Sequence, residues 1–397
     1  MARGRARARR GDHPAPPRRR MILPGATLGV LGGGQLGRMF TMRAREMGYR
    51  VIVHDPDPES PAGACGDDQI RAPYDDTDAL DHLASRCRAV TTEFENVPAA
   101  AMERLAARVR VRPGPAAVAI AQDRIAEKSF LQAHGFATAA FAPVGSGGEA
   151  ADAFRAIAAP ACLLKTARLG YDGKGQATVR SPDEAREAWE ALGRVPCVLE
   201  RRLDLEREAS VVLARGDDGA AVAFPPGENV HVGGILHTTT VPATLDDETR
   251  TAALSLALRV AEALEYVGVL GVELFVADGG RLYVNELAPR PHNSGHWTLD
   301  AASVDQFELQ VRALCGLPLP TPHLLSPVSM VNILGDAWDD AAPDWGSALA
   351  LPGVKLHLYG KRVPRAGRKM GHLNCLAASG PEALALALEA HRRLRIP

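Results

Sequence analysis

The sequence lacks three features: a long apolar run, an excess of one charge sign and a closely spaced cysteine pair. A membrane-spanning helix needs about 20 mostly apolar residues, so the first absence excludes a helical membrane protein. The formal net charge of −1 provides no global field to attract nucleic acid, and any preference for phosphate must come from local sites. The six cysteines are scattered without a C-x-x-C pair, which argues against a disulfide framework or a zinc site and favours the reducing cytoplasm.

The chain is long enough to need more than one core. Its 397 residues exceed the size at which one domain usually keeps growing, and 46% apolar and 23% charged residues are ordinary values for a globular protein. Changes in composition predict a basic extension over residues 1–20 and folded units over residues 21–115, 116–318 and 319–397.

The basic extension carries eight arginines and almost no apolar side chains, so it cannot bury a core. We expect it to be disordered or to precede the true start of the protein at Met21. A nucleic-acid-binding arm and a transit peptide are the alternatives, although the segment lacks an h-region and the serines of a transit sequence.

A β-α-β unit is predicted next. The apolar run 27–31 leads into the glycine pattern G-x-G-x-x-G at residues 32–37, and a second apolar run ends at Asp55. Further strands at 89–92 and 109–111 continue the alternation and predict a parallel sheet. The glycine loop favours an anion at a helix N-terminus, and a purely structural tight turn is the alternative.

A helix is predicted over residues 116–134, and a second glycine-rich loop follows at residues 170–176. Its glycines let the backbone approach a polyphosphate closely, while Lys165 upstream and Lys174 within the loop match the charge of such a ligand. A flexible loop also suits a lid that excludes water from a reactive intermediate. A mobile hairpin tip with solvated lysines is the alternative.

The strands on either side of Gly279 and Gly280 are predicted to form a hairpin. If these two residues centre the turn, residues whose numbers sum to 559 lie opposite each other, and Glu273 and Glu286 form such a pair. Directly opposed like charges destabilise an antiparallel pair, and the pair should resist full ionisation unless a cation joins it. We favour a magnesium ion that bridges both carboxylates. An exposed acidic face with a slipped register is the alternative.

The segment 285–298 is polar and broken by prolines, so we predict a binding loop rather than a core element. Its candidate side chains are Arg290, His292, Asn293, Ser294 and His296. A second basic group is predicted in a Gly/Pro-rich loop and consists of Lys361, Arg365, Arg368 and Lys369. Such a group suits a phosphate monoester, although solvated charge is the commoner fate of such runs.

Five stretches together resemble the N5-carboxyaminoimidazole ribonucleotide synthase family of ATP-grasp enzymes. They are residues 34–39, 93–98, 170–176, 285–298 and 367–372. The resemblance spans residues 28 to 373 and implies a mixed α/β and α+β fold, with a Rossmann-like N-terminal domain, a central ATP-grasp domain and a small C-terminal domain. It also implies an ATP-grasp ligase of purine biosynthesis that carboxylates aminoimidazole ribonucleotide with ATP and bicarbonate, through carboxyphosphate.

The resemblance places ATP and Mg²⁺ between two sheets of the central domain. The residues implied to contact the nucleotide are Arg124, Lys165, Gly170, Tyr171, Asp172, Gly173, Lys174, Gly175, Gln176, Glu200, Arg201, Arg202, Leu203, Glu208, His231, Asn285 and Glu286. Those implied to bind the acceptor substrate are Gln35, Tyr171, His292, Asn293, Ser294, Lys361 and Arg368.

Catalytic roles are implied for Asp172, Lys174, Arg290 and Lys361. Asp172 would orient the amine of the ribonucleotide and accept its proton, while Lys361 and Arg368 would hold the 5′-phosphate. The sequence departs from the family pattern at Leu169, where a second glycine is usual, and at Arg202 and Leu205, which replace aromatic residues near the adenine. These departures bear on loop mobility and nucleotide affinity.

Three alternatives remain at this point: a sister ATP-grasp ligase such as a formate-dependent glycinamide ribonucleotide transformylase, an NAD-dependent dehydrogenase that uses residues 32–37, and a non-catalytic binding module. We expect small-molecule substrates only, with no nucleic acid or membrane partner, and a cytoplasmic homodimer.

Overall fold

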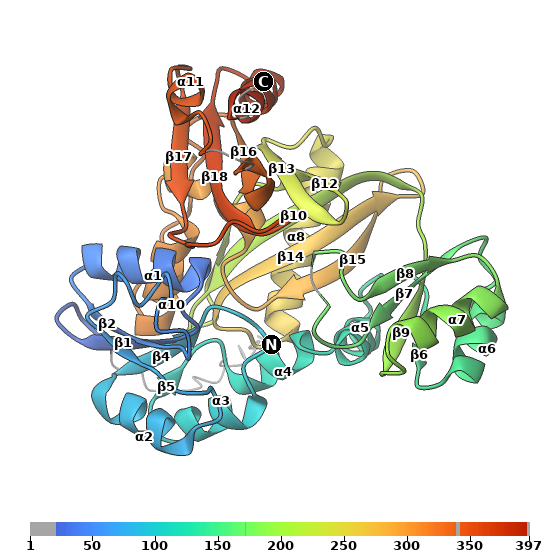
Figure 1. Ribbon diagram of the computed structural model, residues 1–397, viewed down its shortest axis with the longest axis horizontal. Helices are drawn as coiled ribbons and strands as arrows, with labels where there is room; N and C mark the ends of the chain where they lie inside the picture. The colour runs from blue at the N-terminus through green and yellow to red at the C-terminus, as the bar shows by residue number, and fades with distance from the viewer. Residues whose placement is uncertain (1–20, 171, 339–341, 395–397) are drawn as a thin grey trace, which may run out of the picture.

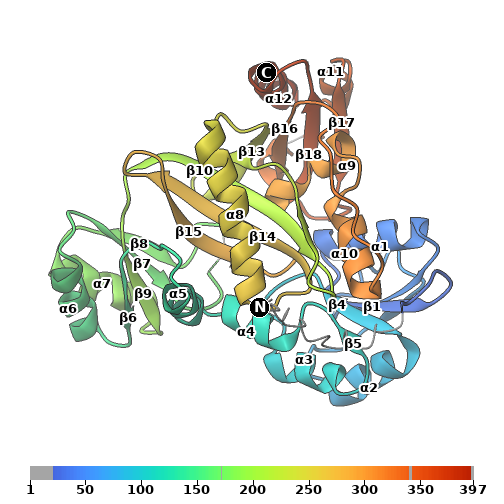
Figure 2. The same cartoon turned by 180° about the vertical axis from the view of Figure 1, so that it is seen from behind.

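The computed structural model describes residues 21–170, 172–338 and 342–394. The predictions for the basic extension over residues 1–20 and for Tyr171 lie outside these residues. The described chain forms three β-sheets, with helices packed on their faces (Figures 1 and 2).

The N-terminal sheet is parallel, with strand order β3-β2-β1-β4-β5, which confirms the predicted Rossmann-like unit. Its strands are β1 (Thr27–Leu31), β2 (Arg50–His54), β3 (Asp68–Ile70), β4 (Ala89–Thr92) and β5 (Arg110–Val111). The accompanying helices are α1 (Gln35–Glu46), α2 (Thr77–Arg86) and α3 (Ala99–Ala106). The central strand β1 is an apolar run whose last four residues are buried, as a parallel strand covered on both faces requires.

A small antiparallel sheet lies at the opposite end of the molecule, drawn in green in Figure 1. Its order is β6-β9-β7-β8, with β6 (Phe141–Val144), β7 (Cys162–Thr166), β8 (Gln176–Val179) and β9 (Cys197–Arg201). The amphipathic helices α6 (Gly147–Ile157) and α7 (Pro182–Ala191) cover one face of this sheet. The glycine-rich loop at residues 170–176 connects β7 to β8.

The third sheet is the largest and runs in the order β15-β14-β10-β12-β13-β16-β18-β17, with β11 added beside β10. Its strands are β10 (Leu205–Arg215), β11 (Ala221–Ala223), β12 (Gly227–Val232), β13 (Ile235–Val241), β14 (Gly268–Ala277), β15 (Arg281–Ala288), β16 (Val328–Leu334), β17 (Val354–Leu358) and β18 (Lys369–Leu376). Because β13 pairs with β16, the sheet continues from the predicted central unit into the predicted C-terminal one. The unit boundaries themselves stay predictions.

The remaining helices pack on the sheets or connect their strands. They are α4 (Pro115–Ala121), α5 (Arg124–Ala133), α8 (Asp247–Ala263), α9 (Thr298–Ala301), α10 (Gln306–Cys315), α11 (Trp345–Leu349) and α12 (Gly380–Arg393), with the short 3-10 helices η1 (Asn293–Gly295) and η2 (Gly335–Ala337). Figure 2 shows α8 lying across the large sheet. Helix α10 buries Phe307 and Val311 against the N-terminal sheet and α1, so that the first two units share a core.

Three local predictions were wrong. The stretch 116–134 forms two helices, because Asp123 caps the second by accepting hydrogen bonds from the amides of Ile125 and Ala126. Lys369 begins strand β18 rather than lying within a loop. The segment after β15 was predicted to lie outside the core, but His296 and Trp297, between η1 and α9, are completely or almost completely buried.

Two expectations from composition can be compared with the described residues. No helix in the described part of the chain is both long enough and apolar enough to cross a membrane. All six cysteines are free, and five of them are buried.

Candidate active site

The glycine loop between β1 and α1 is filled by the chain's own carboxylates. Gly33 N donates to Asp55 Oδ2 at 2.6 Å, and the amides of Gly34 and Gly37 donate to the two oxygens of Glu93 at 2.5 and 2.6 Å. Burial raises the pKa of Glu93, although both amide donors oppose the rise. A dinucleotide phosphate would need these same amides. The loop is therefore a turn whose amides are bound by the protein's own carboxylates. This arrangement argues against an NAD site at residues 32–37, which the dehydrogenase alternative requires.

The hairpin of β14 and β15 brings Glu273 and Glu286 together as direct Cα partners, which confirms the predicted pair. The predicted turn was wrong, however. Ala277 pairs with Arg281, so the turn has three residues and the pairs nearest to it sum to 558. A β-bulge leaves Asn285 unpaired and shifts the register by one residue, so that Glu273 still meets Glu286.

Both carboxylates of this pair have basic partners within the protein. Arg124 Nη1 donates to Glu286 Oε2 at 2.7 Å, and His292 Nε2 lies 3.2 Å from Glu273 Oε1. Burial raises the pKa of Glu273, but the hydrogen bond and charge of His292 outweigh burial and hold that pKa at about 2. The expectation that the pair resists full ionisation unless a cation joins it stays a prediction, and Arg124 on α5 and His292 in the segment after β15 are the protein's own partners of the two carboxylates.

The imidazole of His292 is held in one orientation. Its Nδ1 lies 2.8 Å from Ser294 Oγ, and Ser210 Oγ donates to that same oxygen at 2.7 Å. The backbone amide of Ser294 also lies 3.3 Å from Nδ1, so Ser294 holds this side of the ring while Nε2 faces Glu273. Gly271 makes room for this arrangement, because a Cβ there would lie 2.8 Å from the Cβ of His292.

A buried cluster of opposite charges lies beside the hairpin. Lys165 Nζ donates to Glu200 Oε2 at 3.0 Å, and Lys128 Nζ lies 3.3 Å from the same oxygen. Burial raises the pKa of Glu200, but the charges of the two lysines outweigh it and hold that pKa at about 2. Burial also lowers the pKa of Lys165. Two lysines share one carboxylate, so this region favours an anionic ligand such as a polyphosphate.

Glu127 on α5 lies next to this cluster and contacts the backbone of β15. Its Oε1 accepts a hydrogen bond from Leu287 N at 2.6 Å. Burial, followed by the charge of Glu286, raises the pKa of Glu127 to about 8. Through this hydrogen bond the carboxyl group fixes α5 to the backbone of β15.

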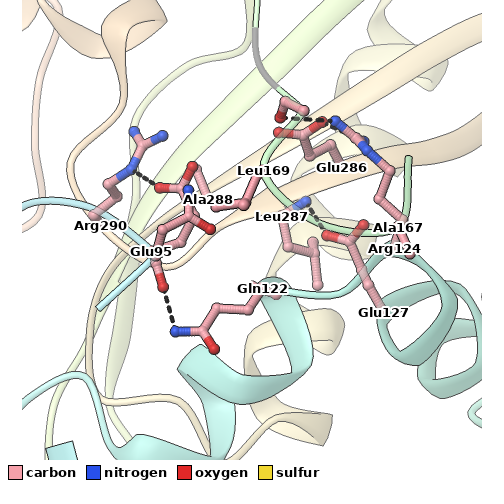
Figure 3. A pocket seen from close by; sticks show the side chains of 13 residues that line it. Glu95, Gln122, Arg124, Glu127, Ala167, Leu169, Glu286, Leu287, Ala288 and Arg290 are labelled. Carbon is pink, nitrogen blue, oxygen red and sulfur yellow. Dashed lines mark hydrogen bonds and ion pairs between the residues drawn. The ribbon is translucent and has the colours of Figure 1, made fainter. Parts of the chain in front are cut away.

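A pocket opens between α5, β15 and the loop that follows β7 (Figure 3). Two guanidinium groups, those of Arg124 and Arg290, line it together with Leu169. Arg290 Nε donates to Glu95 Oε2 at 2.5 Å. Burial raises the pKa of Glu95, but the charge of Arg290 outweighs it and holds that pKa at about 2. Both guanidinium groups are therefore fixed by carboxylates while they still line the pocket.

Lysine side chains of the C-terminal unit contact both other units. Lys361 Nζ donates to Gln35 Oε1 at 2.5 Å, at the first residue of α1. Lys369 Nζ donates to Asp172 Oδ1 at 2.7 Å, in the loop between β7 and β8. Burial, and then the charge of Arg368, lower the pKa of Lys361 to about 8. Residues far apart in sequence thus converge on one region.

Three family models match successive parts of the chain. A ribonucleotide synthetase preATP-grasp domain matches residues 25–122, an ATP-grasp domain matches residues 129–307, and a phosphoribosylaminoimidazole carboxylase C-terminal domain matches residues 328–385. The N5-carboxyaminoimidazole ribonucleotide synthase of Brucella melitensis is 45% identical over 354 residues, which cover 89% of this chain and 96% of that protein. The chain belongs to this family.

Other members of the family agree. The Bacillus subtilis synthase is 41% identical over 89% of this chain and 92% of its own length. A crystal structure of an ADP complex of N5-carboxyaminoimidazole ribonucleotide synthetase superposes with a TM-score of 0.88 at 41% identity, covering 94% of this chain and 98% of that one. The Aspergillus clavatus enzyme, in complex with ADP and 5-aminoimidazole ribonucleotide, gives a TM-score of 0.84 at 31% identity, covering 92% and 99%.

Membership of the synthase family confirms the predicted fold and activity. The chain is an ATP-grasp ligase with a preceding domain, an ATP-grasp domain and the family's C-terminal domain. It carries out the ATP-dependent carboxylation of aminoimidazole ribonucleotide in purine biosynthesis. The transformylase and the binding module are thereby set aside.

The structure of this synthase brings many of the predicted site residues together, although their individual roles stay predictions. Contacts join Arg124 to Glu286, Lys165 to Glu200, Glu208 to His231 and Lys361 to Gln35. Other predicted residues face the protein interior. Asn293 exchanges two hydrogen bonds with Asn332, and Ser294 is buried beneath His292.

The rest of the predicted set lies on the surface or in the loop. Arg201 and Arg202 are exposed at the end of β9, next to the buried Leu203. Lys174 in the loop and Gln176 at the start of β8 are exposed, and Gly173 and Gly175 have positive φ values. The carbonyl oxygen of Gly170 accepts a hydrogen bond from Arg124 Nη2 at 3.5 Å. Arg368 donates to the carbonyl oxygen of Val363 at 2.9 Å.

Sequence reasoning missed several charged residues of the site. Glu95, Glu127 and Lys128 were not predicted, although Arg290, Leu287 and Glu200 all depend on them. Glu93 and Glu95 had a visible signal, because they follow directly on a buried strand as a carboxylate pair two residues apart. No sequence signal marked Glu127 and Lys128, because they resemble ordinary polar residues on the surface of a helix.

Proposed function

We propose that ATP binds between the small sheet and the hairpin of β14 and β15, and that its γ-phosphate lies near Arg124 and Lys165. The observation that carries this proposal is the excess of positive charge around Glu200, where two lysines share one carboxylate. The backbone of residues 200–203, at the end of β9, would contact the adenine. Glu208 would bind the ribose, and its contact with His231 at 2.7 Å supports a fixed orientation of that carboxylate.

We further propose a magnesium site at Glu273 and Glu286, and the donor set fits it. Asn285, at the bulge beside Glu286, donates from Nδ2 to Glu273 Oε2 at 3.1 Å, and its Oδ1 is buried without a partner, so three side chains with hard oxygen donors lie on one short stretch of the hairpin. Among the described residues no group of three His, Cys, Asp or Glu side chains converges, which leaves the other ligand positions to ATP phosphates and water. A bound magnesium ion would neutralise charge on the transferring phosphoryl group.

Bicarbonate would be activated next to Arg290 and His292. One of its oxygens attacks the γ-phosphorus of ATP, the bond to the ADP oxygen breaks, and carboxyphosphate and ADP result. Arg290 is fixed by Glu95 and His292 by Ser294, so both groups face the developing charge without reorganising.

The exocyclic amine of the ribonucleotide then attacks the carboxyl carbon, or CO₂ released from carboxyphosphate, and phosphate leaves. Asp172 would orient the amine and accept its proton, with Lys174 near the departing phosphate. Lys361 and Arg368, beside Gln35 on α1, would hold the 5′-phosphate. Closure of the loop between β7 and β8 would exclude water while carboxyphosphate exists.

Isotope transfer tests the carboxyphosphate route directly. With ¹⁸O-labelled bicarbonate, the oxygen that attacks phosphorus stays on phosphate when the carboxyl carbon is transferred. We expect one labelled oxygen in each phosphate released, measured by mass spectrometry or ³¹P NMR. Unlabelled phosphate together with carboxylated product would contradict the route.

The pH dependence of the Lys361 site gives a second prediction. The pKa of this lysine is about 8, so its charge is lost as the pH rises through that value. If it holds the 5′-phosphate, kcat/KM for the ribonucleotide should fall above about pH 8. Lys361→Arg keeps its charge over this range and should remove the fall. Identical profiles for the wild type and this variant would contradict the assignment.

A cytoplasmic homodimer also remains part of this proposal. The six free cysteines support a reducing compartment. The homodimer is implied by the family resemblance and is measured by light scattering of the purified chain.

A further inference from the structure

The loop between β7 and β8 adopts a conformation that its own residues do not favour. Leu169 has a φ of +62° and Asp172 a φ of +46°, both in the left-handed region that is costly for residues with a Cβ atom. Gly173 and Gly175 also have positive φ values, which glycine adopts freely. Contacts outside the loop must therefore stabilise this arrangement of its described residues.

One such contact joins two glycines without any side chain between them. A Cβ on Gly234, in the turn between β12 and β13, would lie 2.7 Å from Gly173 Cα and 3.1 Å from Gly173 N. In the other direction, a Cβ on Gly173 would lie 3.1 Å from both Gly233 O and Gly234 Cα. The backbone of the loop thus rests directly on the backbone of a turn that belongs to the large sheet.

The residue beside this contact is anchored to the same sheet. Asp172 accepts a hydrogen bond from Lys369 at the start of β18, and β18 is linked to the β12 and β13 hairpin through β16. The hairpin also carries His231, the partner of Glu208. A loop of the small sheet is therefore fixed to the large sheet at two adjacent points, with site residues next to each.

We propose that Gly234 is a positioning residue for the carboxylation: its lack of a side chain lets Gly173 close onto the β12–β13 turn and so fixes Asp172 over the reacting groups. This inference rests on the proposed function. It extends that function by naming the surface against which the loop closes.

The chemistry makes the consequence of poor closure measurable. When the loop closes fully, the amine of the ribonucleotide takes the carboxyl group and one ADP appears for each carboxylated product. When water enters, it cleaves carboxyphosphate to bicarbonate and phosphate, so ADP and phosphate form without product. The ratio of ADP to carboxylated product therefore reports the position of the loop.

Gly234→Ala and Gly233→Ala form a matched pair of variants. Both glycines are left-handed, with φ values of +80° and +60°, so both variants carry the strain of a left-handed alanine. A Cβ at Gly233, however, has nothing within 4 Å, whereas one at Gly234 meets backbone that cannot rotate away. We expect both variants to lower Tm through backbone strain, and only Gly234→Ala to prevent closure of the loop onto the turn.

In steady-state assays Gly234→Ala should lower kcat/KM for ATP by about 10- to 100-fold and raise the ratio of ADP to product above one. Gly233→Ala should stay within about twofold of the wild type and keep the ratio at one. Equal kinetics and equal ratios for the two variants would overturn the inference.

Proteolysis provides a readout that does not depend on turnover. A non-hydrolysable ATP analogue should protect the wild type and Gly233→Ala from tryptic cleavage after Lys174, and should protect Gly234→Ala much less. Equal protection of both variants, or no protection of the wild type, would overturn the role of the turn. A wild type that is protected but inactive would instead reject the proposed function and leave the glycine contact standing.

Discussion

Glutamine in place of Glu273 or Glu286 should lower turnover at least about 100-fold, which corresponds to about 2.7 kcal/mol of lost transition-state stabilisation. Either change keeps the volume of the side chain but removes one of the two charged oxygen donors on the hairpin. Phosphoryl transfer would then lose charge neutralisation where the γ-phosphate reacts. ADP release measured across a magnesium titration should show a raised magnesium requirement for both variants.

The stability of the ligand-free variants follows from the ion pairs of the hairpin. If the two carboxylates had no basic partners, removing one charge would relieve their repulsion and make either variant more stable than the wild type. Because Arg124 pairs with Glu286 and His292 with Glu273, we instead expect a lower Tm without ligand. Glu262→Gln on the exposed face of α8 removes the same charge and serves as the control. Near-wild-type turnover of either hairpin variant at low magnesium would show that the residue is not a metal ligand.

The largest loss of stability should come from Glu200→Gln. The carboxylate of Glu200 is only 2% exposed and neutralises Lys165 and Lys128, so glutamine leaves two buried ammonium groups without a counter-charge. Breaking a buried pair in this way typically costs about 3 to 5 kcal/mol. We expect a loss of this size in urea unfolding. Glu389→Gln is the matched control, because its arginine partners on α12 lie at the surface and the change should have no measurable effect.

The pH dependence of unfolding separates this mechanism from simple loss of packing. The pKa of Glu200 is about 2 in the folded protein, below the ordinary value of 4.5 that applies when the chain is unfolded. Its contribution to stability is therefore complete above about pH 4.5 and is lost as the pH falls toward 2. The wild type and Glu200→Gln should converge in stability over that window. A constant difference between them down to pH 2 would contradict the ionic account.

Local patterns in the sequence were sufficient for four of the five strands of the N-terminal sheet, without β3, and for the pairing of Glu273 with Glu286. The predicted turn was wrong, and the pair was predicted correctly only because a bulge at Asn285 shifts the register by one residue. No sequence pattern indicates that bulge. The glycine pattern at residues 32–37 predicted the strand, turn and helix correctly. Its occupant could not be predicted, because Glu93 lies 56 residues or more away from the amides that it accepts from.

Other features depend on contacts between units that local patterns do not encode. The ion pair of Asp172 with Lys369 spans 197 residues, and the hydrogen bond of Lys361 to Gln35 spans 326. The resemblance to known synthases supplied Asp172, Lys361 and Gln35 as site candidates without their partners, and Lys369 was predicted only as part of a basic group. The break between α4 and α5 could have been predicted from Asp123, because Asp is a strong N-cap. The apolar residues on both sides of Asp123 instead suggested one continuous helix.

Acceptor-dependent release of ADP tests the central claim most directly. The purified chain is supplied with ATP and magnesium, and ADP is measured with bicarbonate and aminoimidazole ribonucleotide, with each omitted in turn, and with formate and glycinamide ribonucleotide instead. We predict that ADP release requires the aminoimidazole ribonucleotide, rises with bicarbonate and is matched by carboxylated product. Equal ADP release without that ribonucleotide, or with formate in place of bicarbonate, would contradict the account.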